Sequence, residues 1–309
     1  MACTVEQQFL KEGHNIIAYL QNIAVLFCIN GILALTLNFI MGYAGIFSLA
    51  HAIFFGVGAY ATAYIALNFS DSLLLCLLAS AMISAVLSMA LALPALRVRG
   101  EYFVAASLGL QVIGVTIFSE WKSVTGGLGG MIGIPRPNLF GYVFNNDTAF
   151  LALALVILLL VLGITALLVR GSFGRSLMAI RDSESAAQTY GKHVNAVKTL
   201  SVAVSAGLAG VAGSLYAFYM SFINPESFML EMSILLMAMV IIGGTGTLFG
   251  PIVGAALLMS LPAALTYLPF LPPSELGTIQ QIIYGLAMVL LMMFRPGGLV
   301  GGRTKGKAA

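Results

Sequence analysis

Long stretches without a charged residue constrain this chain more than any other feature of its sequence. Residues 13–70 contain no Asp, Glu, Lys or Arg. A charge at the centre of a bilayer is costly, so such intervals mark membrane crossings. Because only 8% of the residues are charged, a soluble globular domain, a disordered chain and a nucleic-acid-binding module are excluded. Further uncharged intervals are residues 72–96, 102–119, 148–169, 199–225, 232–274 and 276–294.

The interval lengths predict an all-α fold, a polytopic transmembrane helical bundle formed by one domain, residues 1–309. A helical crossing needs about 20 residues, so residues 13–70 and 232–274 hold two crossings each and every other interval holds one. The total is about nine; eight and ten stay open, because a re-entrant segment within residues 13–70 fits as well. We expect helices near 15–40, 52–69, 72–96, 102–119, 148–169, 199–222, 232–245, 250–268 and 277–294.

The distribution of basic residues predicts the orientation. Of the 14 Lys and Arg residues, 11 fall in one set of loops, and the side with this excess is cytoplasmic. The loop 170–198 and the C-terminus are therefore expected in the cytoplasm and the loop 120–147 outside. Nine crossings place the N-terminus outside, whereas an even number places it inside. The residues on the basic side are Arg97, Arg99, Arg170, Arg175, Arg181, Lys192, Lys198, Arg295, Arg303, Lys305 and Lys307.

Two glycine clusters interrupt the intervals that hold two crossings, one near residues 42–50 and one near residues 243–250. They indicate non-helical backbone, which a membrane tolerates only when it is buried in protein or faces water. Two broken or re-entrant segments fit an internally repeated transporter, and ordinary tight turns fit equally well. In the first interpretation they line a translocation pathway with the outer loop. The candidate pathway residues are Gly42, Gly45, Ser48, His51, Thr125, Gly126, Gly127, Gly243, Gly244 and Thr245.

The loop of residues 170–198 carries a local helix signal. Asp182 and Ser183 are good N-cap residues, residues 184–190 can form about two turns, and Gly191 suits the C′ position. A short helix is therefore predicted between two crossings. It is either a basic helix on the membrane surface or a docking helix for a cytoplasmic subunit, and its mixed charge favours docking.

The sequence contains no recognisable catalytic or metal-binding constellation. His14, His51 and His193 fall at different predicted depths, and no HExxH motif or pair of Cys ligands occurs. Residues 301–308 match GxxxxGK, but Ala308 stands where a phosphate-binding loop needs Ser or Thr. We therefore expect neither an enzyme nor a metal site, and no nucleotide hydrolysis by this chain.

Seven segments spread over nearly the whole chain carry a resemblance to a known family. They are residues 37–51 (LNFIMGYAGIFSLAH), 54–60 (FFGVGAY), 97–103 (RVRGEYF), 125–127 (TGG), 174–184 (GRSLMAIRDSE) followed by Ala187 and Gly191, 243–251 (GGTGTLFGP) and 294–299 (FRPGGL). Together they resemble the permease subunits of branched-chain (hydrophobic) amino-acid ABC importers, specifically the LivM-type subunit.

This resemblance implies a multi-pass permease of the bacterial inner membrane that forms the translocation pathway with a homologous second permease subunit. Two cytoplasmic ATPase subunits would use ATP and Mg, and a periplasmic solute-binding protein would deliver branched-chain or other small amino acids. No cofactor is implied for this chain. Residues 175–191 would be the coupling loop and helix that sit on an ATPase subunit. The docking residues implied are Arg175, Arg181, Asp182, Ser183, Glu184, Ala187 and Gly191.

Three alternatives stay open at this point. A self-sufficient secondary transporter or facilitator for a small neutral or zwitterionic solute shares the pair of helix breaks. The same ABC permease role with urea, an amide or an aromatic acid as substrate also fits the resemblance. A membrane scaffold without transport activity is the third.

Overall fold

The computed structural model describes residues 2–96, 101–139, 141–266, 276–294 and 297–300. Its long helices match the nine predicted ones within a few residues, except that the first begins at Ala2 rather than near residue 15. They are α1 (Ala2–Asn38), α2 (His51–Asn68), α3 (Leu73–Leu96), α4 (Glu101–Glu120), α6 (Asp147–Arg170), α9 (Val194–Met220), α10 (Leu230–Gly243), α11 (Gly250–Thr266) and α12 (Leu276–Phe294).

Six helices in the described part of the chain are long and apolar enough to cross a membrane. Shorter apolar stretches, Gly250–Leu261 and Gln281–Leu290, lie in α11 and α12. The chain is therefore a polytopic helical membrane protein, as its uncharged intervals predict. The six segments are Tyr19–Tyr43, Leu73–Ala90, Tyr102–Glu120, Asp147–Arg170, Val194–Met220 and Pro225–Gly243.

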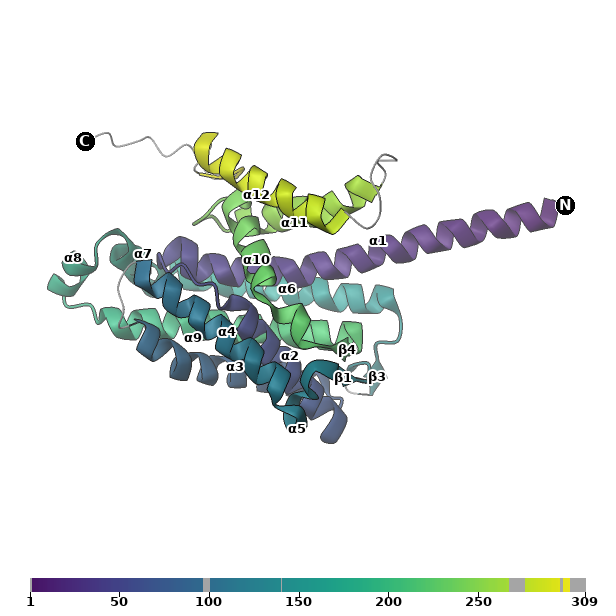
Figure 1. The fold of residues 1–309 in the computed structure, drawn as a ribbon, viewed down its shortest axis with the longest axis horizontal. Coiled ribbons are helices and arrows are strands. Elements are labelled where there is room, and N and C mark those ends of the chain that lie inside the picture. Colours follow the sequence, from purple (N-terminus) through teal and green to yellow (C-terminus); the bar gives the residue numbers. More distant parts are fainter. Residues whose placement is uncertain (1, 97–100, 140, 267–275, 295–296, 301–309) are drawn as a thin grey trace.

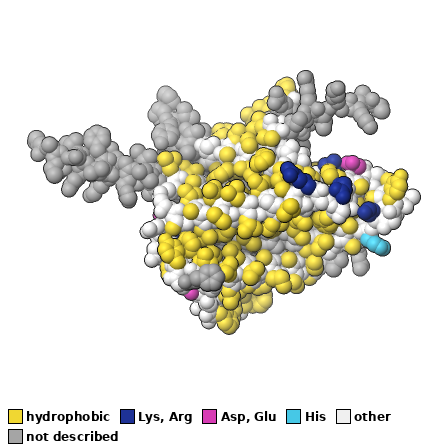
Figure 2. Space-filling view, turned by 180° about the vertical axis from the view of Figure 1, so that it is seen from behind, with side chains coloured by type: hydrophobic (Ala, Val, Ile, Leu, Met, Phe, Trp, Pro, Cys, Tyr) yellow, Lys and Arg dark blue, Asp and Glu magenta, His cyan; other side chains and the backbone are white. Residues whose placement is uncertain are grey.

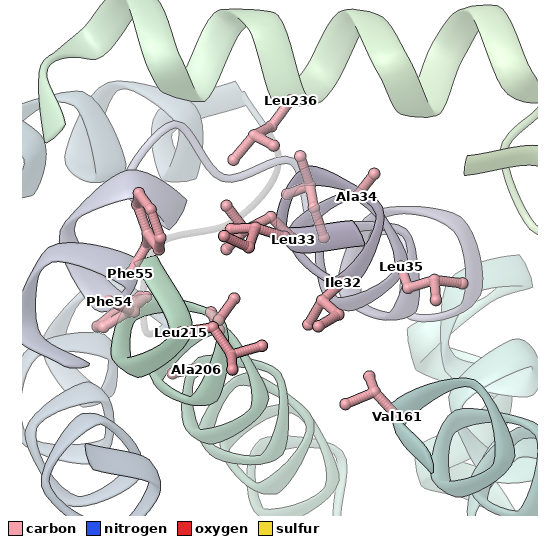
Figure 3. Close-up of a cluster of buried hydrophobic side chains, with 14 of the residues drawn as sticks. Ile32, Leu33, Ala34, Leu35, Phe54, Phe55, Val161, Ala206, Leu215 and Leu236 are labelled. Carbon is pink, nitrogen blue, oxygen red and sulfur yellow. The ribbon is translucent and has the colours of Figure 1, made fainter. Parts of the chain in front are cut away.

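The first helix runs through the middle of the molecule. Four consecutive residues, 32–35, are fully buried, and Figure 3 shows them among side chains of the surrounding helices, including Phe55, Val161, Leu215 and Leu236. In an 18-residue window of the span Tyr19–Tyr43, 78% of the positions are buried, against 28% in the windows of the α3 and α4 spans. A helix that is apolar on all sides belongs to a bundle core, and the outer helices face lipid or another membrane protein.

Glycines let α9 approach its neighbours α2 and α3 closely. A Cβ added to Gly58 would lie 2.4 Å from the Cα of Gly210, and one added to Gly213 would lie 2.2 Å from the carbonyl oxygen of Phe55. In lipid, small residues drive helix association because they permit such backbone contact. The glycine spacing of α9 therefore serves packing.

Short elements gather at the two ends of the bundle (Figure 1). We call one end the strand end, because it contains the short strands. There the loop after α4 is paired with the segment between α9 and α10, since Met131 pairs antiparallel with Ile223. The opposite end, called the α8 end, is formed by α7 (Ser172–Asp182) and α8 (Glu184–Thr189). The strand end contains α5 (Lys122–Thr125), η2 (Gly127–Gly129), β1 (Met131–Ile132), β2 (Asn138–Leu139), β3 (Tyr142–Val143), β4 (Phe222–Ile223) and η3 (Pro225–Phe228).

Candidate functional site

The first glycine cluster forms a buried connection between α1 and α2. The last turn of α1 is the π-helix η1 (Phe39–Tyr43), and the chain is non-helical from there to the start of α2. Two backbone amides after this turn bond to serines of other helices: Leu49 N–H donates to Ser107 Oγ at 3.0 Å and Ala52 N–H to Ser233 Oγ at 3.1 Å. The protein thus supplies hydrogen-bond partners for backbone N–H groups that lipid could not supply.

The second glycine cluster is a turn between α10 and α11. Gly244 and Gly246 take φ angles of +123° and +72°, which side-chain-bearing residues rarely adopt. The segment near the C-terminus closes this turn, because Leu299 N–H donates to the carbonyl oxygen of Ile242 at 2.9 Å and Val300 N–H to that of Gly243 at 3.0 Å. These contacts satisfy carbonyls that the end of a helix leaves without partners.

The two breaks lie side by side at the α8 end. The Asn38 side chain donates from Nδ2 to the carbonyl oxygen of Thr247 at 2.8 Å and accepts at Oδ1 from Gly246 N–H at 2.9 Å. A Cβ at Gly42 would lie 2.3 Å from Gly246 N. The sequence analysis missed Asn38; its signal was an amide side chain inside an uncharged interval, just before a glycine cluster.

Arg181, in the last turn of α7, also reaches the first break. Its Nη1 donates to the carbonyl oxygen of Gly42 at 2.7 Å, while Nε and Nη2 donate to Asp182 Oδ1 at 3.3 and 3.2 Å. A Cβ at Gly45 would lie 2.8 Å from Arg181 Cγ. The guanidinium therefore points toward the helix break.

The predicted short helix is confirmed as α8, with both of its caps. Ser183 Oγ accepts from Ala186 N–H at 3.3 Å at the N-terminus. At the C-terminus Gly191 has a φ of +72°. Its N–H donates to the carbonyl oxygen of Gln188 at 2.9 Å, and Lys192 N–H donates to that of Ala187 at 3.1 Å. This pair of bonds is the Schellman motif, which ends helices at glycine.

One side of α8 is held against its neighbours. Ala187 is buried with Ile180 of α7 and Val194 of α9. Glu184 forms an ion pair with Lys198, four residues into α9. The sequence analysis did not find this pair, although opposite charges on the two flanks of Gly191 were its signal.

The seven candidate docking residues therefore divide into two groups. Arg181, Glu184 and Ala187 contact other parts of this chain, and Gly191 shapes the end of α8. Arg175, Asp182 and Ser183 are exposed, and 40% of the Arg181 side chain is exposed as well. Tyr190, which the sequence analysis passed over, is 86% exposed at the end of α8.

Basic side chains gather at the α8 end of an otherwise apolar surface (Figure 2). In the described part of the chain they come from the end of α6 and from α7 to α9. The remaining basic residues of the predicted cytoplasmic side, Arg97, Arg99, Arg295 and those after residue 300, lie outside the described residues, as does the GxxxxGK match.

The remaining pathway candidates are Thr125 to Gly127 at the strand end, His51 in α2, and Ser48 and Thr245 within the two breaks. Thr125 is buried at the strand end, where its hydroxyl lies 2.7 Å from the carbonyl oxygen of Phe118 and accepts from Gly127 N–H at 3.2 Å. His51 is buried with Nε2 2.9 Å from Thr36 Oγ1, and Ser205 Oγ donates to the Thr36 carbonyl at 2.6 Å. Ser48 Oγ accepts from Ala50 N–H, and Thr245 is exposed beside Gly244.

Buried polar groups between the two ends also escaped the sequence analysis. Gln111 Nε2 donates to the carbonyl oxygen of Phe228 at 2.8 Å, and the ring of Phe228 packs 5.7 Å from that of Tyr60. Gln111 Oε1 and the Tyr60 hydroxyl are buried without a hydrogen-bond partner in the described structure. Their signal was polar side chains on helices α2 and α4 of an otherwise apolar bundle.

The apolar bundle, the paired helix breaks and the capped helix α8 define a membrane transport subunit. Residues 19–293 match the family model described as the permease component of the branched-chain amino acid transport system. The chain belongs to this family of ABC permease subunits, which are transport components without catalytic activity.

Relatives with assigned names support the same family. The chain is 30% identical over 302 residues to the high-affinity branched-chain amino acid transport permease LivM of Salmonella typhimurium, covering 90% of this chain and 69% of the relative. Identity and coverage are the same for LivM of Escherichia coli. It is also 30% identical over 211 residues to the probable permease LivH of Methanocaldococcus jannaschii, covering 65% of this chain and 64% of that one. No solved structure matches the chain.

Proposed function

We propose that this chain is the membrane-spanning permease of an ATP-binding cassette importer for branched-chain or other small amino acids. The observation that carries the proposal is helix α8, a doubly capped helix at the basic end of the bundle with an exposed Tyr190. The family and the printed names of the LivM relatives support the substrate class.

The proposed topology has nine crossings within a single domain, residues 1–309, in the bacterial inner membrane. The α8 end with loop 170–198 faces the cytoplasm, where the excess of Lys and Arg belongs, and the strand end with loop 120–147 faces the periplasm. The N-terminus is periplasmic. In support, α1 extends away from the bundle on the side of the strand end in Figure 1, and Asn22 Oδ1 accepts from the Tyr219 hydroxyl near the end of α9 at 3.0 Å.

The proposed assembly pairs this chain with a homologous second permease, and the likeness to LivH supports such a partner. Two cytoplasmic ATPase subunits use ATP and Mg, and a periplasmic solute-binding protein delivers the substrate. The pathway runs from Thr125, Gly126 and Gly127 at the strand end to the two breaks at the α8 end. The other residues assigned to it are Gly42, Gly45, Ser48, His51, Gly243, Gly244 and Thr245.

In this assembly the exposed side of α8 docks on an ATPase subunit. Asp182, Ser183 and Tyr190 are exposed at the two ends of α8, and Arg175 is exposed on α7. Aromatic side chains supply much of the binding energy at protein interfaces, so Tyr190 is the central contact. Ala187, Glu184 and Gly191 hold the helix in the shape that docks.

The test compares Tyr190→Ala with Tyr142→Ala, a control at the strand end where the tyrosine is 58% exposed. Loss of a central aromatic contact costs about 2 kcal/mol, so co-purification of the ATPase subunits with Tyr190→Ala falls at least about tenfold. The control retains them. Unchanged association and unchanged uptake with Tyr190→Ala would show that α8 does not dock.

A further inference from the structure

We propose that Arg181 is a positioning residue that transmits the movement of α8 to both helix breaks, rather than a residue that binds the ATPase. The inference rests on the proposed docking of α8. It assigns to Arg181 a role that the exposed residues beside it do not share, because its guanidinium contacts the permease itself.

The contact is built at the end of a transmembrane helix. The carbonyl oxygen of Gly42 lies in the π-helical turn η1, and the last carbonyls of a helix lack partners within it. Arg181 Nη1 supplies one at 2.7 Å. A hydrogen bond from a charged donor is about twice as strong as a neutral one, so α7 and the end of α1 are firmly connected here.

A glycine of the first break makes room for the arginine, and a glycine of the second break lies beside it. A Cβ at Gly45 would lie 2.8 Å from Arg181 Cγ, and Gly45 has a φ of +70°. A Cβ at Gly246 would lie 3.7 Å from Arg181 Nη1 and 3.4 Å from the Gly42 carbonyl oxygen. The Arg181 side chain therefore lies against two segments about 200 residues apart, with 40% of it exposed.

Asn38 extends the connection to the second break. Because Asn38 precedes η1 and bonds both Gly246 and Thr247, a displacement of η1 displaces the turn between α10 and α11 as well. The segment of residues 297–300 is hydrogen-bonded to the same turn, through the carbonyl oxygens of Ile242 and Gly243. Arg181 thus contacts the first break directly and is linked through Asn38 and the second break to residues 297–300.

The connection starts at α8, which is held against α7 and α9. α8 is joined to α7 and α9 by the Ile180, Ala187 and Val194 cluster and by the Glu184–Lys198 ion pair, so these segments move together. Among the described residues, the hydrogen bond that leads from α7 or α8 to a break comes from Arg181. The apolar stack of Phe173 on Phe39, with ring centroids 6.3 Å apart, keeps α7 seated when the arginine is replaced.

The test uses the complete importer in liposomes, containing the permease pair, the ATPase subunits and the binding protein, with radiolabelled leucine as the probe. Three quantities are measured: ATPase co-purification, ATP hydrolysis, and leucine taken up per ATP hydrolysed. For Arg181→Gln we expect assembly and hydrolysis to persist while uptake per ATP falls at least tenfold. Arg181→Lys, which keeps a charged donor, falls about two- to threefold.

A second readout reports the movement directly. Thr245 is exposed in the second break, and the rate at which a thiol reagent labels Thr245→Cys changes between ATP-bound and nucleotide-free importer when the connection is intact. We expect Arg181→Gln to abolish this difference. Lys192→Gln, an exposed cation just beyond α8, is the matched control and keeps both coupling and the labelling difference.

Two outcomes overturn the proposal. Loss of ATPase co-purification with Arg181→Gln and Arg181→Lys would assign Arg181 to docking, and undiminished uptake per ATP with Arg181→Gln would remove it from the connection. Failure of the underlying function is distinguishable, because the unaltered chain would then bind no ATPase subunit. If Arg181→Gln does not accumulate, Arg181→Lys and its labelling rate decide the matter.

Discussion

At the scale of single residues, two glycines set how closely α2 and α9 approach. A Cβ at Gly58 would lie 2.3 Å from the carbonyl oxygen of Gly210 and 2.4 Å from its Cα. These backbone atoms cannot move aside for an added Cβ, whereas the end of a flexible side chain could. The contact therefore leaves no room for a side chain at position 58.

Gly58→Ala is predicted to destabilise the protein by about 1–3 kcal/mol, the usual cost of overpacking, and to lower its thermal midpoint in detergent. Gly163→Ala in α6 is the control, since nothing lies within 4 Å of the added Cβ. Replacing a helical glycine by alanine there gains about 0.5–1 kcal/mol. Equal midpoints for the two variants would contradict the tight contact.

Residue roles were predictable where the partner is close in the sequence. Ser183 and Gly191 were identified as caps because capping depends on neighbours three or four positions away. The partner of Arg181 lies 139 residues away, and α2, α3, α4 and α6 come between the two in the chain. Local patterns contain no information about such a contact, so Arg181 was grouped with the docking residues.

At the scale of elements, α8 is held by contacts on its inner side, and the ion pair between Glu184 and Lys198 joins it to α9. Exchanging the two charges tests this connection. Glu184→Lys and Lys198→Glu alone each place like charges together, and we expect each to lower the thermal midpoint and the coupling of hydrolysis to uptake.

The double exchange restores the attraction, so both properties recover. Because Glu184 is partly exposed, the interaction energy in the double-mutant cycle is about 0.5–1 kcal/mol. The pair does not hold α8 if the double-mutant cycle gives no interaction energy, or if the double variant has the same thermal midpoint and coupling as the single variants.

Elements were predictable where the bilayer dictates them. Uncharged intervals placed the long helices because lipid excludes charge from their length. Helix α7 was missed since its 11 residues include Arg175, Arg181 and Asp182, which break the uncharged pattern. The start of α1 was placed too late for a related reason. The helix includes Glu6, Lys11 and Glu12, and an uncharged interval cannot mark helical residues that carry charges.

At the scale of the whole molecule, our proposal assigns two functions to one bundle. In it the glycine breaks and the strand end are the two ends of a pathway, and α8 is a docking surface outside the bundle. The contact between the two breaks could not be predicted, because Asn38 and its partners Gly246 and Thr247 are more than 200 residues apart in the sequence. The energy for transport comes, in our proposal, from the ATPase subunits docked on α8.

The measurement that tests this account most directly is leucine uptake into liposomes by this chain, alone and within the complete importer. The account predicts that the complete importer takes up leucine saturably, and only when ATP is present on the side of the membrane that carries the ATPase subunits. It predicts no uptake by the chain alone under any ion gradient. Gradient-driven uptake by the isolated chain, without ATP or partners, would identify a self-sufficient secondary transporter and contradict the central claim.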